Sequence, residues 1–192
     1  MALHSTHRRK YSDHHIQSPL AKMDRTCLVC HRESEETLRQ NVYERQEKCL
    51  EVRDQLEDIL AKAHIEAKFA WDQGATEAEM KDALQDIRKS QRRWDYAVAS
   101  HGASFHAPQE VLRLMGNGIT YAQEARLKIA KVLAKHGFTG DVPMPDISTK
   151  AKAQAYIGLD MPAMESKKAT FMETIVPQWL SIAKDNGKLL DY

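Results

Sequence analysis

The feature that most limits the fold of this chain is a long helical pattern between Ser34 and Gly74. Ser34 is a favourable N-cap, and Glu35 and Glu36 suit the positive end of a helix dipole. Apolar or small residues then recur at spacings of three, four and seven, namely Leu38, Val42, Cys49, Val52, Leu56, Ile59, Ala63 and Ala70. About 39 helical residues form a rod of roughly 58 Å, and such a stripe usually packs against another helix. Because a monomer would leave these side chains in water, we expect the stripe to mediate self-association.

Capping signals predict four further helices. A capping box begins at Thr76, and Pro108 suits the first turn of a helix. Ser148 can cap a short helix, and Pro177 predicts a kink in the last one. The expected ranges are 76–102, 108–136, 148–158 and 162–186. No segment has a convincing strand pattern, so the sequence predicts an all-α fold built from long antiparallel helices.

Charge and hydropathy exclude several classes of protein. The chain has 192 residues, with 28 Lys and Arg against 27 Asp and Glu, so its formal charge is +1. A nucleic-acid partner would show as a strong basic excess or stripe, and we expect none. The apolar runs are far shorter than the roughly 20 residues that span a bilayer. Residues 1–10 have no apolar core like that of a secretory signal peptide.

One short motif indicates chemistry, the CxxCH sequence Cys27-Leu28-Val29-Cys30-His31. Two thiols at this spacing can form thioether bonds to the two vinyl groups of a haem, and the adjacent histidine can then bind the iron. Zinc, a redox dithiol and chance are the alternatives. Zinc would need a second Cys or His pair, and Cys49 lies alone on the helical stripe. A thioredoxin-type dithiol would need a βαβ context.

The motif divides the chain into two predicted parts. Residues 1–33 show no sustained periodicity and form a loop-rich segment for haem attachment. Residues 34–192 form the long-helix scaffold and the dimerisation region.

Other histidines lie where a haem could use them. His14 lies in the loop before the CxxCH motif, and His101 and His106 flank the junction between two expected helices. Each alone is most simply an exposed or hydrogen-bonded histidine, but multihaem cytochromes need a second imidazole for each low-spin iron. We interpret His64 and His136 as ordinary histidines of a helix surface and a helix end.

Several stretches from residue 11 to the C-terminus match one family in ligand spacing and in helix surface. They are Tyr11-Ser12-Asp13-His14, Cys27-x-x-Cys30-His31, Ala63-His64-Ile65-Glu66-Ala67-Lys68, Gly74-Ala75-Thr76-Glu77-Ala78-Glu79-Met80-Lys81, Ala99-Ser100-His101-Gly102, His106-Ala107-Pro108 and Pro145-Asp146-Ile147-Ser148-Thr149-Lys150. With these residues the chain resembles the C-terminal part of the periplasmic pentahaem cytochrome c nitrite reductases, which form ammonium. Residues 1–10 fall outside the resemblance.

The resemblance implies roles for five residues. Cys27 and Cys30 would attach the last of five haems, and His31 would be its proximal ligand. His14 would be the distal ligand of the second haem, and His106 that of the fourth. All three histidines would therefore bind haem iron, while the long helices would form the interface of a homodimer.

The resemblance also implies an activity, the six-electron reduction of nitrite to ammonium in the periplasm. A quinol-linked donor or a small cytochrome would supply the electrons. In that family a CxxCK motif attaches the catalytic haem and calcium binds nearby, but this sequence contains neither a CxxCK motif nor those calcium ligands. We therefore expect part of a larger enzyme, inactive alone, that supplies one haem c site.

Two other functions compete with this expectation. One is a stand-alone electron carrier with a single haem. The other is a helical dimerisation module whose CxxCH motif is vestigial.

Overall fold

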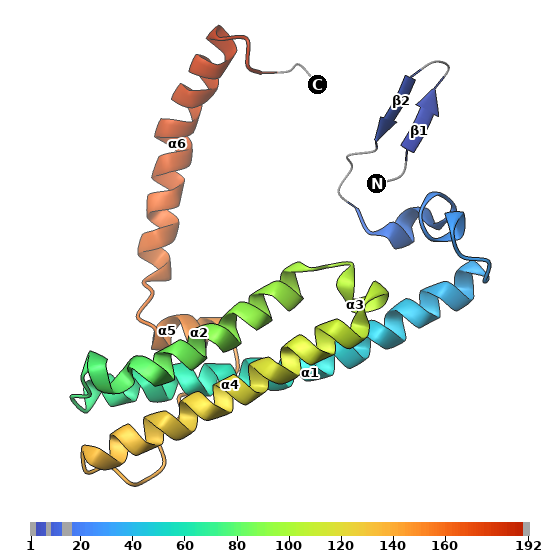
Figure 1. Cartoon of the computed structure of the whole chain (residues 1–192). Coiled ribbons are helices and arrows are strands. Elements are labelled where there is room, and N and C mark those ends of the chain that lie inside the picture. Colours follow the sequence, from blue (N-terminus) through green and yellow to red (C-terminus); the bar gives the residue numbers. More distant parts are fainter. Residues whose placement is uncertain (1–2, 7–8, 13–16, 190–192) are drawn as a thin grey trace. The chain divides into compact units, whose positions relative to one another are not determined.

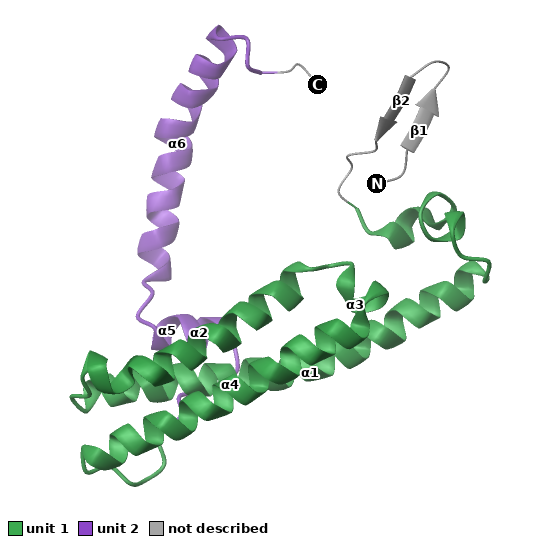
Figure 2. Cartoon of the chain, in the orientation of Figure 1, with its two compact units in different colours: residues 1–142 green, residues 143–192 purple. Residues whose placement is uncertain are grey.

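A computed structural model describes residues 3–6, 9–12 and 17–189, so His14 lies outside the described residues (Figure 1). The chain divides into two compact units, residues 1–142 and 143–192 (Figure 2). The boundary predicted after residue 33 is a different division, and it stays a prediction. In chain order the elements are β1 (Leu3–Thr6), β2 (Arg9–Ser12), the 3-10 helices η1 (Pro19–Arg25) and η2 (Cys27–Val29), and the helices α1 (Glu35–Asp72), α2 (Glu77–Ala99), α3 (Ala103–His106), α4 (Pro108–Lys135), α5 (Lys150–Tyr156) and α6 (Met161–Asp185). The predicted all-α class is confirmed apart from one short hairpin.

The long helices of unit 1 begin where local signals predict. The Ser34 hydroxyl accepts a backbone N–H of the first turn of α1 at 3.2 Å. The helix stops before Gly74, whose φ of +88° is one that L side chains rarely adopt. Thr76 caps α2 with a complete capping box, and Pro108 is the first residue of α4. These three predicted starts are confirmed.

Three long helices of unit 1 lie side by side and share one core (Figure 1). Helices α1 and α4 run in the same direction, and α2 runs opposite to both. The largest apolar side chains that are fully buried come from all three helices, Leu56 of α1, Met80 of α2, and Val111 and Ile129 of α4. The core of unit 1 is therefore formed within a single chain.

This core covers the apolar stripe of α1. Leu56, Ala63 and Ala70 are all 0% exposed and belong to the same core as residues of α2 and α4. The expectation that a monomer leaves the stripe in water is therefore wrong. Periodicity identifies the buried face of a helix but not the helix that covers it.

The three helices approach one another closely at Gly118 of α4. A Cβ atom at this position would lie 2.9 Å from Cδ2 of Leu56, which has no exposed surface in which to move. Ser90 of α2 is also fully buried, and its hydroxyl donates to the Gly118 carbonyl oxygen at 2.8 Å. The missing side chain of Gly118 thus sets the spacing of all three helices.

The segment before α1 differs from the expected loop. Strands β1 and β2 form an antiparallel hairpin in which Leu3 pairs with Ser12 and Thr6 with Arg9, which corrects the expectation of no strand. Each strand has four residues and few of the β-branched or aromatic types, so its pattern is weak in the sequence. The 3-10 helices η1 and η2 replace much of the remaining loop.

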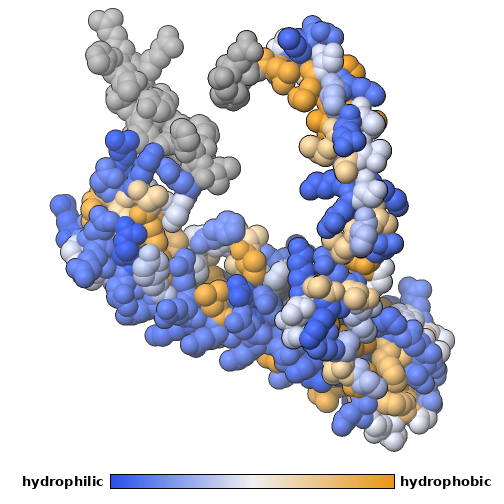
Figure 3. All heavy atoms as spheres, turned by 180° about the vertical axis from the view of Figure 1, so that it is seen from behind, coloured by the Kyte–Doolittle hydropathy of each residue, from blue (hydrophilic) through white to orange (hydrophobic). Residues whose placement is uncertain are grey.

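Unit 2 consists mainly of α5 and α6. Thr149 caps α5, whereas the predicted cap Ser148 donates its hydroxyl to the Asp146 carboxylate at 2.7 Å. Helix α6 continues past Pro177 and has no buried residue. Apolar side chains lie exposed along it (Figure 3), among them Met164, Phe171, Met172, Trp179, Leu180 and Ile182. Within the described part of the chain, neither α6 nor any other helix is long and apolar enough to cross a membrane.

The packing at Gly118 predicts opposite effects for two glycine substitutions in one helix. Gly116 of α4 has no atom within 4 Å of a Cβ, so Gly116→Ala should gain up to about 1 kcal/mol of helix propensity. Gly118→Ala must displace Leu56, and overpacking of this kind costs about 1–3 kcal/mol. Urea unfolding should therefore rank Gly116→Ala as the more stable variant. Equal free energies of unfolding would contradict the close approach.

The capping box of α2 predicts an acid-sensitive contribution to stability. The backbone N–H and the hydroxyl of Thr76, followed by the His136 side chain, lower the pKa of Glu79 from 4.5 to about 2. A carboxyl group whose pKa falls on folding stabilises the fold fully above its unfolded pKa, and this stability is lost as pH falls through the folded value. Glu79→Gln should therefore lower Tm clearly at pH 7 and much less near pH 2, where about half of the folded-state carboxyl groups are protonated. Glu77→Gln, in the same turn, is the control and should have a smaller effect. A Tm difference as large at pH 2 as at pH 7 would contradict this account.

Candidate functional site

The segment that contains the CxxCH motif is held against the first turns of α1. The Met23 side chain of η1 is 2% exposed. Arg39 of α1 donates from Nη2 to the Leu20 carbonyl oxygen at 3.1 Å and to Glu35 at 2.5 Å. These contacts attach η1 to the helix and so fix where η2 begins.

The motif itself forms one tight turn. The backbone N–H groups of Cys30 and His31 both donate to the Cys27 carbonyl oxygen, at 3.2 and 2.9 Å. Both thiols are free, with Cys27 partly exposed and Cys30 exposed. The turn brings together the two cysteines and the histidine that the sequence predicts to act together.

Thr26 is a residue of this site that sequence reasoning missed. Its hydroxyl lies 2.8 Å from the Pro19 carbonyl oxygen, 2.9 Å from that of Lys22 and 3.7 Å from the Cys27 sulfur. It therefore joins the end of η1 to the first cysteine. The available signal was a hydroxyl residue immediately before the motif, a type that often hydrogen-bonds nearby backbone.

Glu33 is the second residue that sequence reasoning missed. Its Oε2 atom lies 3.7 Å from Nδ1 of His31 and accepts the Arg32 backbone N–H at 3.0 Å. Hydrogen bonds from backbone N–H groups, the largest from Glu33 itself, lower the pKa of this carboxyl, and His31 lowers it further. A carboxylate thus faces one ring nitrogen of the predicted iron ligand.

The donor set fits a covalently attached haem. Cys27 and Cys30 lie within one turn as free thiols, and an exposed imidazole follows directly. Val29 between them is 69% exposed and offers an apolar surface beside the thiols. Among the described residues, no group of three or more His, Cys, Asp or Glu could hold a metal ion.

Cys49 takes no part in this site. It is 4% exposed on α1, and its sulfur lies 3.9 Å from the Ser104 carbonyl oxygen. Burial raises the pKa of its thiol, as expected for a small buried side chain rather than a reactive group.

The structure does not bring His106 beside His31. His106 ends α3, its ring centroid lies 4.5 Å from that of Phe105, and its side chain is exposed. Helix α3 contacts α1 at Cys49 and at Arg45, which donates to the Phe105 carbonyl oxygen at 2.9 Å. These positions lie about 15–21 Å along α1 from its first residue, at 1.5 Å per residue. His106 therefore fits a ligand of some other iron, and this role stays a prediction.

The remaining histidines have varied surroundings. His101 and His64 are exposed, in the turn after α2 and on α1. His136, at the end of α4, lies 3.2 Å from Oε2 of Glu79, so it is tied to the capping box of α2. His14, the predicted ligand of a second haem, lies outside the described residues.

Comparison with known proteins identifies the family. The family model for cytochrome c552 matches residues 1–187. The chain belongs to the cytochrome c552 family. Proteins named cytochrome c-552 from Bacteroides thetaiotaomicron and Parabacteroides distasonis are 68% and 67% identical to it over 180 residues. That of Porphyromonas gingivalis is 65% identical over 181 residues. Each alignment covers 94% of this chain and 36% of the relative.

The comparison corrects the family inferred from the resemblance. The matched family is cytochrome c552, not the pentahaem cytochrome c nitrite reductases, and the match includes residues 1–10, which the resemblance left out. Ligand spacing and helix capping identify a scaffold for haem, but they do not define a catalytic activity. The chain spans about a third of the length of the curated relatives that it matches.

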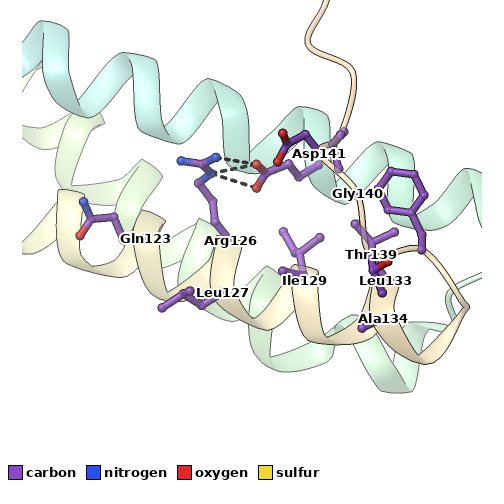
Figure 4. Close-up of a pocket in the computed structure, with 13 residues that line it drawn as sticks. Gln123, Arg126, Leu127, Ile129, Leu133, Ala134, Thr139, Gly140 and Asp141 are labelled. Carbon is purple, nitrogen blue, oxygen red and sulfur yellow. Dashed lines mark hydrogen bonds and ion pairs between the residues drawn. The ribbon is translucent and has the colours of Figure 1, made fainter.

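Unit 1 of this cytochrome c552 chain also contains an open pocket of about 620 Å³, lined by α4, by Glu66 of α1 and by residues 138–142 (Figure 4). At one side Arg126 donates from Nε and Nη2 to Glu66, at 2.7–3.0 Å. This pairing compensates for the burial of the Glu66 charge. No residue predicted as a haem ligand lines the pocket.

Proposed function

We propose that this cytochrome c552 chain attaches one haem c through Cys27 and Cys30 and relays electrons with it. The observation that supports this most directly is the turn that holds both free thiols and His31 together. When bound, the haem supplies reversible one-electron chemistry. The chain supplies two thioether positions and one imidazole, on a segment anchored to α1.

Two of the motif's neighbours help to present these groups. Thr26, the residue before the first thiol, is anchored to η1 by its hydroxyl, and Arg39 of α1 holds the same 3-10 helix. Because this support comes from α1, loosening the start of that helix should disturb the attachment site before the core of unit 1. We also propose a periplasmic location, since c-type haem is attached outside the cytoplasm.

At a finer level, we propose that the whole protein uses these electrons to reduce nitrite to ammonium. The support is the presence of histidines beyond the CxxCH motif, with His14 and His106 as candidate axial ligands of other haems. Calcium and an electron donor, quinol-linked or a small cytochrome, belong to the same proposal. A homodimer also stays a proposal, and the exposed apolar side chains of α6 support it better than the buried stripe of α1.

Haem attachment is tested by changing the motif and leaving the rest intact. Expressed with a haem-attachment system, the wild-type chain should keep one haem after denaturation, as shown by its mass and absorption spectrum. The variant with Cys27→Ser and Cys30→Ser should lose covalent haem entirely. Cys49→Ser is the matched control, because Cys49 is buried away from the motif, and it should keep the haem. A wild-type chain that acquires no haem would favour the alternative function, a helical dimerisation module whose CxxCH motif is vestigial.

Nitrite turnover distinguishes the proposed reduction of nitrite to ammonium from simple electron transfer. The haem-loaded chain should exchange electrons with a soluble redox dye but form no ammonium from nitrite, because it lacks the CxxCK motif of the catalytic haem. Ammonium production near the 1–10³ per second typical of enzymes would contradict this. The same assay on the protein isolated from its native cells should show six electrons consumed per ammonium formed. Oxidation of the dye by the native protein without ammonium formation would favour a simple electron carrier.

A further inference from the structure

The imidazole of His31 has different surroundings at its two nitrogens. Nδ1 faces Oε2 of Glu33 at 3.7 Å. Within the described part of the chain, no hydrogen bond or ion pair involves Nε2. A neutral imidazole bears its hydrogen on one nitrogen and a lone pair on the other. A carboxylate beside Nδ1 favours the hydrogen there and so leaves the lone pair on Nε2.

The Glu33 carboxylate also contacts the backbone beside it. Its Oε2 atom, the one that faces His31, accepts the Arg32 backbone N–H at 3.0 Å. Glu33 also directly precedes Ser34, the N-cap of α1, so the positive end of the helix dipole favours its negative charge. The nearby Glu35 is paired with Arg39 instead.

We propose that Glu33 is a positioning residue for His31, which orients Nε2 toward the haem iron and lowers the reduction potential of that haem. This inference rests on the proposed haem attachment at Cys27 and Cys30. Carboxylates that face the non-ligating nitrogen of a histidine fix its tautomer and raise its basicity toward the metal. A more basic ligand and a nearby negative charge both favour ferric over ferrous iron.

The competing explanation is that Glu33 only favours the start of α1. Other acidic residues at that helix end would then be equivalent to it. Glu36 is a matched comparison, because it is exposed, lies in the first turn of α1 and has the same charge. Neutralising either residue removes one unit of charge near the helix start, but only Glu33 faces His31.

The test measures the reduction potential of the haem-loaded chain by spectroelectrochemistry. Glu33→Gln removes the charge but keeps the shape of the side chain and an oxygen acceptor. We expect it to raise the equilibrium constant for haem reduction about tenfold, which is about 59 mV for a one-electron couple. Glu36→Gln should stay near the wild-type value, and Glu33→Asp, which keeps the charge, should lie closer to wild type than Glu33→Gln does.

The outcomes distinguish this inference from the function on which it rests. A wild-type chain without covalent haem overturns the proposed attachment and the role of Glu33 together. Covalent haem in all variants, with equal shifts for Glu33→Gln and Glu36→Gln, overturns the role of Glu33 alone. If Glu33→Gln attaches no haem, Glu33→Asp becomes the test variant. A Glu33→Asp chain that attaches haem and has the wild-type reduction potential supports the need for a carboxylate.

Discussion

The close packing of Leu56 against Gly118 is the contact on which the structure of unit 1 depends. It joins α1 to α4, and the hydrogen bond from Ser90 to the Gly118 carbonyl oxygen adds α2 at the same level. Because α1 is rigid over 38 residues, fixing its middle also fixes its two ends. The segment with the CxxCH motif is anchored at one of these ends, through Arg39, and Glu66 pairs with Arg126 nearer the other.

The positions of the long helices were predictable, because helix ends depend on local chemistry. Ser34, Thr76 and Pro108 act within a few residues of themselves, so a single sequence shows them. The partner of each helix was not predictable in the same way. The stripe of α1 was assigned to a second chain, whereas α2 and α4 cover it, because the choice depends on residues such as Gly118 whose importance appears only on packing.

The residues of the candidate site also divide into those that the sequence predicts and those that only the structure reveals. The two cysteines and His31 follow from a motif whose spacing is set by the haem itself. Thr26 and Glu33 carry no such spacing rule, and their contacts arise from the conformation of the turn. His106, predicted as a ligand of a different haem, lies on α3 and far along α1 from the motif, and its role stays a prediction.

The contacts that would support the proposed haem come from one helix, α1. In the described part of the chain Cys30, His31 and Glu33 are all exposed. The electrostatics of the proposed haem therefore depend strongly on whatever covers the segment. A charged neighbour such as Glu33 has most influence where water is excluded, since the effective dielectric falls there. Covering this face would thus strengthen the effect of Glu33 on the iron without altering any contact within the chain.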